Sequence, residues 1–194
     1  MQLAGVKIGF ALTASFCTLE PVVQQIEQFV KGGCEVYPIM TREAATVDTR
    51  YGKAREWMER LVRITGKPVM TGIVDVEPIG PQKLVDVVVV APCTGNTMAK
   101  LANGITDGAV LMAAKAQLRN QRPVVVAIST NDGLGLNARN LGSLLNTRNV
   151  YFVPFGQDSP RNKPNSLIAK MDLLAATIVE ALQGRQLQPI IVTY

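Results

Sequence analysis

The chain has 194 residues, of which 47% are hydrophobic and 18% charged, and its formal net charge is +5. This balance indicates a folded, globular protein large enough to bury a core, and it excludes a disordered one. Basic residues are mixed with acidic ones, and only five Phe and one Trp are present, so the basic, aromatic stripe typical of nucleic-acid binding is missing. No apolar run reaches the roughly 18 residues of a membrane-spanning helix.

The sequence contains no histidine and three widely separated cysteines, Cys17, Cys34 and Cys93. Without imidazole or clustered thiolates, a zinc or transition-metal site is not expected. Nothing at the start of the sequence resembles a signal peptide, and the cysteines form no CxxC pair. Both observations predict a reduced, cytoplasmic compartment.

Hydrophobic periodicity predicts alternating strands and helices in the first half of the chain. Residues 6–12 and 34–40 are predicted to be strands, joined by a helix from about residue 19 to 31. A charged, amphipathic helical stretch is expected at residues 45–64. Residues 67–76 are then predicted to form another strand, followed by a rigid, proline-containing connector.

The second half is organised around a β-branched run at residues 85–91, which predicts a strand covered on both faces. Pro92 is expected to stop this strand, and Asp107 to cap a later helix that ends at Arg119. The remaining predicted elements are a strand at 124–129, a helix at 138–147, a strand at 150–154, a loop at 155–166 and a helix at 167–182. The whole pattern predicts a single three-layer, doubly wound α/β domain over residues 1–194 with a mostly parallel sheet.

Small and hydroxylic residues follow the β-branched run at positions 93–97, with the sequence CTGNT. Small residues let backbone amides approach an anion, hydroxyls add donors, and the next helix presents unpaired amides. In open α/β sheets, ligands bind at this carboxyl end of the strands. The segment therefore indicates a phosphate site, although Thr94 or Asn96 could equally be a simple helix N-cap.

Two further strand ends carry small or hydroxylic residues that lack the GxGxxG pattern of dinucleotide-binding proteins. Thr13, Ala14 and Ser15 follow the first predicted strand, and Thr41 follows the second. Each set has a structural alternative: the first is also a plausible helix start, and Thr41 a plausible N-cap.

The segment APCTGNT, residues 91–97, resembles the PASANT-type motif of the homo-oligomeric flavin-containing cysteine decarboxylase superfamily. The longer strings APCTGNTMAKLANGITDG, STNDGLGLNARN and YFVPFGQDSP resemble one branch of it, the family of dipicolinate synthase B subunits, over essentially the whole chain. The resemblance implies a flavoprotein-like fold, a trimer or dodecamer, and bound FMN. The residues that it implies around FMN are Thr13, Ala14, Ser15, Thr41, Thr94, Gly95, Asn96 and Thr97.

The resemblance also points to two candidate catalytic residues. Decarboxylases of the superfamily carry a catalytic His in the region where this sequence has Glu77. Glu77 is either a proton acceptor or a loop carboxylate with a structural or cofactor-orienting part. Asn131 aligns with the Asn of the PxMNxxMW motif, which contacts the substrate carboxylate in those enzymes. The Pro, Met and Trp of that motif are absent, so specificity for a cysteinyl peptide is not implied.

Resemblance to this branch implies a partner, the A subunit of dipicolinate synthase, which carries NADP. The pair would oxidise dihydrodipicolinate to dipicolinate in the mother cell of a sporulating bacterium. Arg139, Arg161 and Lys163 are the candidate partners of the two substrate carboxylates, because paired anions need matched cations. The alternatives are an FMN-dependent decarboxylase, a flavin prenyltransferase, or a non-catalytic protein that stabilises the A subunit.

Overall fold

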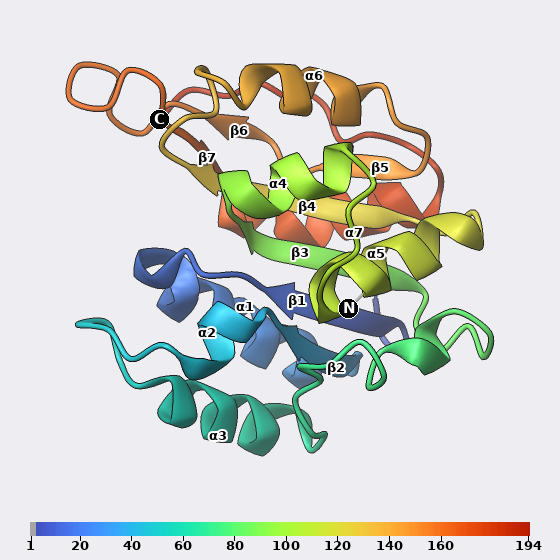
Figure 1. Ribbon diagram of the computed structural model, residues 1–194. Helices are drawn as coiled ribbons and strands as arrows, with labels where there is room; N and C mark the ends of the chain where they lie inside the picture. Colours follow the sequence, from blue (N-terminus) through green and yellow to red (C-terminus); the bar gives the residue numbers. More distant parts are fainter. Residues whose placement is uncertain (1–2) are drawn as a thin grey trace.

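The computed structural model describes residues 3–194 and is built around one seven-stranded sheet (Figure 1). The strand order is β2-β1-β3-β4-β7-β6, with β5 paired to β4 off this path. The strands β1 to β5 run parallel, whereas β7 is antiparallel to both β4 and β6. Their bounds are β1 Lys7–Leu12, β2 Glu35–Met40, β3 Val87–Cys93, β4 Val124–Thr130, β5 Val150–Phe152, β6 Phe155–Gly156 and β7 Leu167–Ala169.

Helices cover both faces of the sheet. Helices α1 and α7 pack on one face, and α4, α5 and α6 on the other, while α3 lies beside β2 and α1 (Figure 1). The helices are α1 Leu19–Lys31, α2 Arg42–Thr46, α3 Ala54–Thr65, α4 Gly95–Ala102, α5 Ala109–Arg119, α6 Ala138–Leu145 and α7 Leu174–Leu182, with 3-10 turns η1 Phe16–Thr18, η2 Glu77–Ile79 and η3 Met171–Leu173. The predicted α/β class with a mostly parallel sheet is confirmed.

Strand β3 lies at the centre of the sheet, between β1 and β4, and all seven of its residues are buried. Its β-branched side chains suit a strand that packs against helices on both faces. The prediction that Pro92 ends this strand is wrong, because β3 continues to Cys93. The pairing with β4 shifts register between Val90 and Cys93, and Pro92, which has no amide proton to donate, lies at this shift. No backbone hydrogen bond between β3 and β4 is therefore lost at the proline.

The strand predicted at residues 67–76 is also wrong. Only Met70 forms an isolated bridge there, to Ile39 of β2. The carboxylate of Asp75 accepts hydrogen bonds from the amides of Thr71, at 3.0 Å, and Gly72, at 2.8 Å. This local side-chain bonding competes with a strand ladder and bends the segment into a turn.

Two helix predictions need correction at their beginnings. The helix predicted at residues 167–182 starts only at Leu174, because Leu167–Ala169 form β7 and pair with β4 and β6. Helix α5 has Gly108 at its N-cap, and Asp107 instead accepts a hydrogen bond from Lys100 Nζ at 2.6 Å. The stretch predicted as helical at residues 45–64 is interrupted at 47–53.

Within residues 3–194, no helix combines the length and the hydrophobicity needed to cross a membrane. The same residues contain no group of three or more His, Cys, Asp or Glu side chains placed to hold a metal ion. The three cysteines are free thiols, with Cys17 exposed and the other two buried.

Candidate flavin-binding site

The ends of β1 and β3 are tied together by one buried hydroxyl. Thr13 Oγ1 donates to the carbonyl oxygen of Pro92 at 2.7 Å and accepts from the amide of Thr94 at 3.1 Å. Its side chain is fully buried. Thr13 therefore fixes the relative position of the two strand ends, and its hydroxyl is already occupied within the chain.

Helix α4 begins at the end of β3 with a side-chain cap. Thr94 is the N-cap residue: its Oγ1 accepts from the amide of Thr97 at 3.3 Å and bonds to Thr97 Oγ1 at 3.1 Å. This is the N-cap alternative considered from the sequence. It is compatible with an anion site, because the first turn of α4 still opens toward the carboxyl edge of the sheet.

Gly95, the first residue of α4, lies against the loop that follows β4. A Cβ atom at this position would lie 2.5 Å from Thr130 Oγ1 and 2.8 Å from both Asn137 Nδ2 and Asp132 Oδ1. Asp132 is itself held by hydrogen bonds from Thr130 Oγ1 at 2.6 Å and from Asn137 Nδ2 at 2.7 Å. The lack of a side chain at Gly95 is what lets α4 approach this polar network closely.

A cleft of about 490 Å³ opens in front of these strand ends, a volume in the range of small-molecule sites. Its polar lining includes Thr41, Asn96 and Thr97, and Ala14 contributes only a methyl group. Thr41 also caps α2 by accepting from the amide of Ala44 at 3.3 Å. The remaining lining residues are Arg42, Glu43, Thr94, Lys100, Asp107, Gly108, Ala109, Val110 and Leu111.

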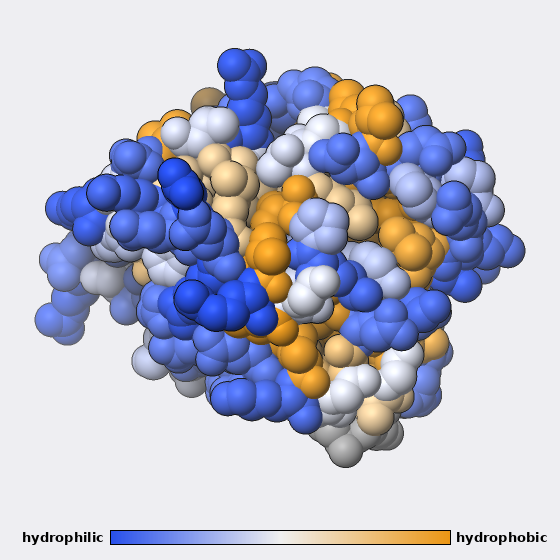
Figure 2. Space-filling view, turned by 90° about the horizontal axis from the view of Figure 1, so that it is seen from below, coloured by the Kyte–Doolittle hydropathy of each residue, from blue (hydrophilic) through white to orange (hydrophobic). Residues whose placement is uncertain are grey.

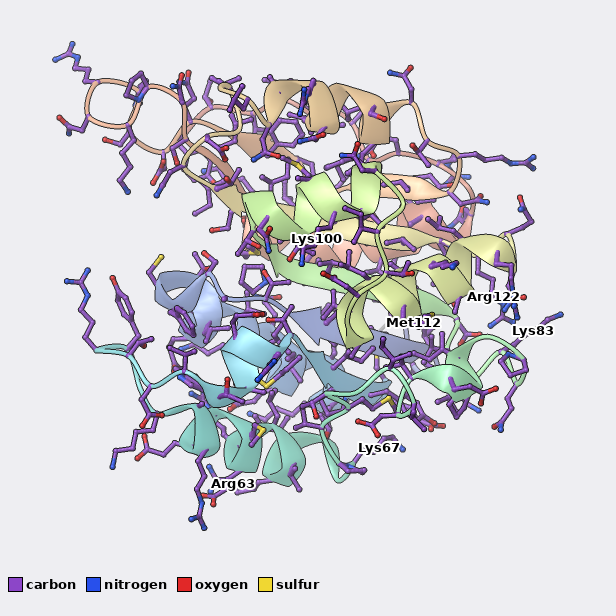
Figure 3. All side chains as sticks on the ribbon, in the orientation of Figure 1. Arg63, Lys67, Lys83, Lys100, Met112 and Arg122 are labelled. Atoms are coloured by element: carbon purple, nitrogen blue, oxygen red, sulfur yellow. The ribbon has the colours of Figure 1, made fainter. Side chains whose placement is uncertain are left out.

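Lys100 extends from α4 and lines this cleft (Figure 3). Its ammonium group pairs with Asp107 at 2.6 Å, and this hydrogen bond lowers the pKa of Asp107 below its usual value. Both side chains are substantially exposed, so the pair adds little to stability. It does supply a cation at the edge of the cleft, where a bound anion would meet it.

A smaller pocket of about 130 Å³ lies on the other side of the β1 end and brings Ser15, Asn131 and Lys163 together. Ser15 Oγ and Ser129 Oγ form a hydrogen bond of 2.8 Å across it. Lys163 Nζ lies 3.7 Å from Asp158, an exposed contact that a ligand could replace. The pocket is also lined by Cys17, Thr18, Thr130, Ser166, Leu167 and Ile168.

Three candidate residues lie apart from these pockets. Glu77, on η2, lines a separate, largely apolar cleft with Met112 of α5 (Figure 3). Arg139 on α6 and Arg161 in the loop after β6 are exposed and lie outside the small pocket that holds Lys163. Glu77 and Asn131 therefore line different cavities, and Lys163 lines the small pocket whereas the two arginines do not.

Four residues that line the two pockets, or support the residues around them, were not predicted from the sequence. Arg42 and Lys100 line the large cleft, Ser129 lines the small pocket, and Asp132 supports the start of α4. Arg42, Ser129 and Asp132 adjoin or follow the end of a strand, which was an available signal. Lys100 lies one turn into α4, and only its direction in three dimensions brings it to the cleft.

Comparison with known proteins settles the family. The family model described as Flavoprotein matches residues 1–180. The chain belongs to the flavoprotein family. It is 54% identical over 191 residues to the B subunit of dipicolinate synthase from Bacillus subtilis, covering 98% of this chain and 96% of that one. The resemblance found in the sequence is confirmed.

Solved structures agree with this assignment. The crystal structure of the dipicolinate synthase B subunit from Bacillus halodurans superimposes with a TM-score of 0.91 at 49% identity, covering 100% of this chain and 99% of that one. DmrB of Burkholderia xenovorans, solved in complex with FMN, gives a TM-score of 0.70 at 18% identity, over 92% and 96% of the chains. At that identity, the second comparison shows the shared fold alone.

Proposed function

We propose that this flavoprotein binds FMN in the large cleft and acts with a partner, the A subunit of dipicolinate synthase, to oxidise dihydrodipicolinate to dipicolinate during sporulation. The observation that carries the proposal is the joining of the β1 and β3 ends beside a capped helix start, in front of a cleft of about 490 Å³. The 54% identity to the Bacillus subtilis protein supports the choice of reaction.

The residues of the cleft fit a flavin mononucleotide. Asn96 and Thr97, in the first turn of α4, offer amide and hydroxyl donors to a phosphate, and Ala14 leaves space for it. Thr13, Thr94 and Gly95 would shape this site rather than contact the ligand through free side chains, whereas Ser15 lines the small pocket. Thr41 lines the cleft from the start of α2. When bound, FMN supplies hydride-transfer chemistry that no side chain can provide.

The small pocket is the proposed site for one carboxylate of the substrate. The Asn131 amide and the Lys163 ammonium are donors suited to an anion, and the hydroxyls of Ser15 and Ser129 add further donors. The incoming carboxylate would replace Asp158 as the partner of Lys163. Glu77, Arg139 and Arg161 lie outside this pocket and have no assigned part in substrate binding here.

The net reaction removes one hydride and one proton from dihydrodipicolinate and produces the aromatic dipicolinate. In the proposed pair, the hydride finally resides on NADP bound to the A subunit. This chain contributes the binding and orientation of the dicarboxylate.

Homo-oligomers are proposed as the assembled state. Figure 2 shows hydrophobic residues gathered in a band across the face that carries α3 and the segment after it. Val74 is 83% exposed, and its neighbour Ile73 lines the apolar cleft that contains Glu77 and Met112. Exposed apolar surface of this kind marks interaction sites. A trimer or dodecamer would bury it.

The reaction is tested by reconstitution. The purified chain is combined with the A subunit, dihydrodipicolinate, NADP and added FMN, and dipicolinate is measured. We expect turnover to require both proteins. Asn131→Ala and Lys163→Met should each raise KM by roughly tenfold, the cost of one hydrogen bond to a charged group. Full turnover by the A subunit in the absence of this chain would rule the proposal out.

A non-catalytic role is the second candidate, and one observation favours it. The hydroxyls of Thr13 and Thr94 are bonded within the chain, so part of the implied phosphate site serves the protein itself. A chain of this kind would stabilise the A subunit without binding FMN. In the reconstitution, turnover that depends on this chain but not on FMN would support this candidate.

A further inference from the structure

The segment that follows α7 returns to the edge of the sheet and covers β6. The amide of Phe155 donates to the carbonyl oxygen of Ile190, and the amide of Val192 donates to the carbonyl oxygen of Phe155, both at 3.0 Å. Ile191 thereby forms a parallel bridge with Phe155. The edge that β6 would otherwise expose is therefore paired over this short length.

Tyr194 crosses beyond β6 and reaches β7 and the residue after it. Its hydroxyl donates to the carbonyl oxygen of Ile168 at 3.1 Å. The ammonium of Lys170 lies 3.7 Å from the centre of its ring, a close cation–π contact. One side chain thus contacts both the middle of β7 and its end.

Gly156, in β6, makes this path possible. A Cβ atom at Gly156 would lie 2.1 Å from the carbonyl oxygen of Val192 and 3.3 Å from the Tyr194 ring. The nearest of these atoms belongs to the backbone, so a side chain at position 156 would push the whole segment away. The glycine in β6 therefore allows the close approach of a segment about 36 residues further along the chain.

The β6–β7 hairpin carries the loop, residues 157–166, that supplies Asp158 and Lys163 to the small pocket. On its β7 side the loop is fixed to β4, because Ser166 Oγ donates to the carbonyl oxygen of Thr130 at 3.3 Å. On its β6 side, the hairpin is paired with residues 190–192 of the segment that follows α7. The hairpin is held from both sides.

We infer that Tyr194 is a positioning residue, which holds the β6–β7 hairpin so that Lys163 stays at the small pocket. The role of Lys163 in this inference rests on the proposed function. The restraint of the hairpin rests on the contacts of Tyr194 alone. Tyr194 does not touch the pocket itself; it acts through the hairpin.

The electrostatic surroundings keep the Tyr194 hydroxyl protonated. Tyr194 is half-exposed, and the partial burial of its side chain, followed by the negative charges of Asp158 and Asp172, raises the pKa of Tyr194 to about 12. The cation that faces the ring is Lys170. The hydrogen bond to Ile168 is therefore retained across the neutral and moderately alkaline range.

Three variants test the inference in the whole chain. Tyr194→Ala removes the ring and the hydroxyl, and Tyr194→Phe removes the hydroxyl alone. Gly156→Ala displaces the segment without changing Tyr194. Gly142→Ala, on α6 with no atom within 4 Å of its added Cβ, is the matched control for a new methyl group.

Hydrogen exchange of residues 157–169 is then measured, together with the kinetics of the chain paired with the A subunit. We expect Tyr194→Ala and Gly156→Ala to speed exchange by about tenfold and to raise KM for dihydrodipicolinate with kcat unchanged, with Tyr194→Phe intermediate. Unchanged exchange, or faster exchange with unchanged KM, would overturn the inference. If even the wild-type pair forms no dipicolinate, the proposed function fails, while faster exchange still supports the restraint of the hairpin.

Discussion

Gly95 lies where the first turn of α4 meets the loop after β4. Three polar atoms, from Thr130, Asp132 and Asn137, surround the position that a Cβ atom would occupy there. The hydrogen bonds between these side chains fix the loop, so the three polar atoms have little freedom to move away from an added Cβ atom. The position of the proposed phosphate site therefore depends on the absence of one methyl group.

Gly95→Ala should lower the free energy of unfolding by about 1–3 kcal/mol, the usual cost of overpacking, and weaken FMN binding. Gly142→Ala is the control, since its added Cβ meets no atom within 4 Å and replaces a helical glycine. That control should stabilise the chain by about 0.5–1 kcal/mol. Chemical denaturation measures both, and an equal effect of the two substitutions would refute the close contact at Gly95.

The three thiols should differ sharply in reactivity. Cys93 is fully buried, and burial raises its pKa to about 12, while burial also raises the pKa of Cys34. The thiolate is the reactive form, so both should resist a thiol reagent in the native chain near neutral pH. Cys17 is exposed and should react first. Mass spectrometry after brief labelling identifies the sites, and rapid labelling of Cys93 would contradict the buried end of β3.

At the scale of elements, one arginine joins α3 to α1. Arg60 donates to both carboxylate oxygens of Glu20, at 2.6 and 3.1 Å, and to Glu27 at 3.2 Å. The hydrogen bond from Arg60 lowers the pKa of Glu20 below its usual value. A lowered carboxylate pKa means that the stabilisation is present above the unfolded pKa and is lost as the pH falls through the folded one.

Arg60→Met should therefore lower the free energy of unfolding by about 0.5–1 kcal/mol near neutral pH, as expected for a partly exposed ion-pair network. The difference from wild type should shrink at acid pH, once Glu20 is protonated in both states. Urea denaturation at several pH values measures this. A difference that stays the same on acidification would show that Arg60 acts by packing alone.

The sequence was a good guide wherever hydrophobic patterning and position along the chain were sufficient. The buried run of β3 and the helix start after it were both predictable, because β-branched residues and a Thr-Gly-Asn-Thr turn carry local signals. Ser15, Thr41 and Asn131 were predicted as site residues from their positions after strands, and this role stays a prediction. The structure places them in the two neighbouring pockets.

Features that depend on tertiary pairing were not predictable in this way. Leu167–Ala169 have a pattern that suits a helix, but they pair with the last residues of β4, Ser129 and Thr130, beyond the part of β4 that pairs with β5. Residues 67–76 have strand-like composition, but Asp75 bonds to the amides that a strand would need. Glu77 follows this segment, and its true location could not be derived from its distance along the chain.

For the molecule as a whole, the carboxyl edge of the parallel strands carries both proposed sites. The large cleft lies on the α2, α4 and α5 side of this edge, and the small pocket lies between the β1 end and the β6–β7 hairpin. Thr13 and Ser15, two residues apart, connect the two regions. Cofactor and substrate would thus meet at adjoining strand ends, as in other open α/β sheets.

Titration of the purified chain with FMN, followed by flavin fluorescence, tests whether the large cleft binds this cofactor. We expect saturable binding of about one FMN per chain. The double variant Asn96→Leu, Thr97→Val should bind FMN more weakly by roughly tenfold or more, because it removes hydrogen bonds to a charged phosphate. Gly142→Ala should bind as wild type does. Absence of saturable binding, or equal affinity in the double variant, would contradict FMN binding at the start of α4.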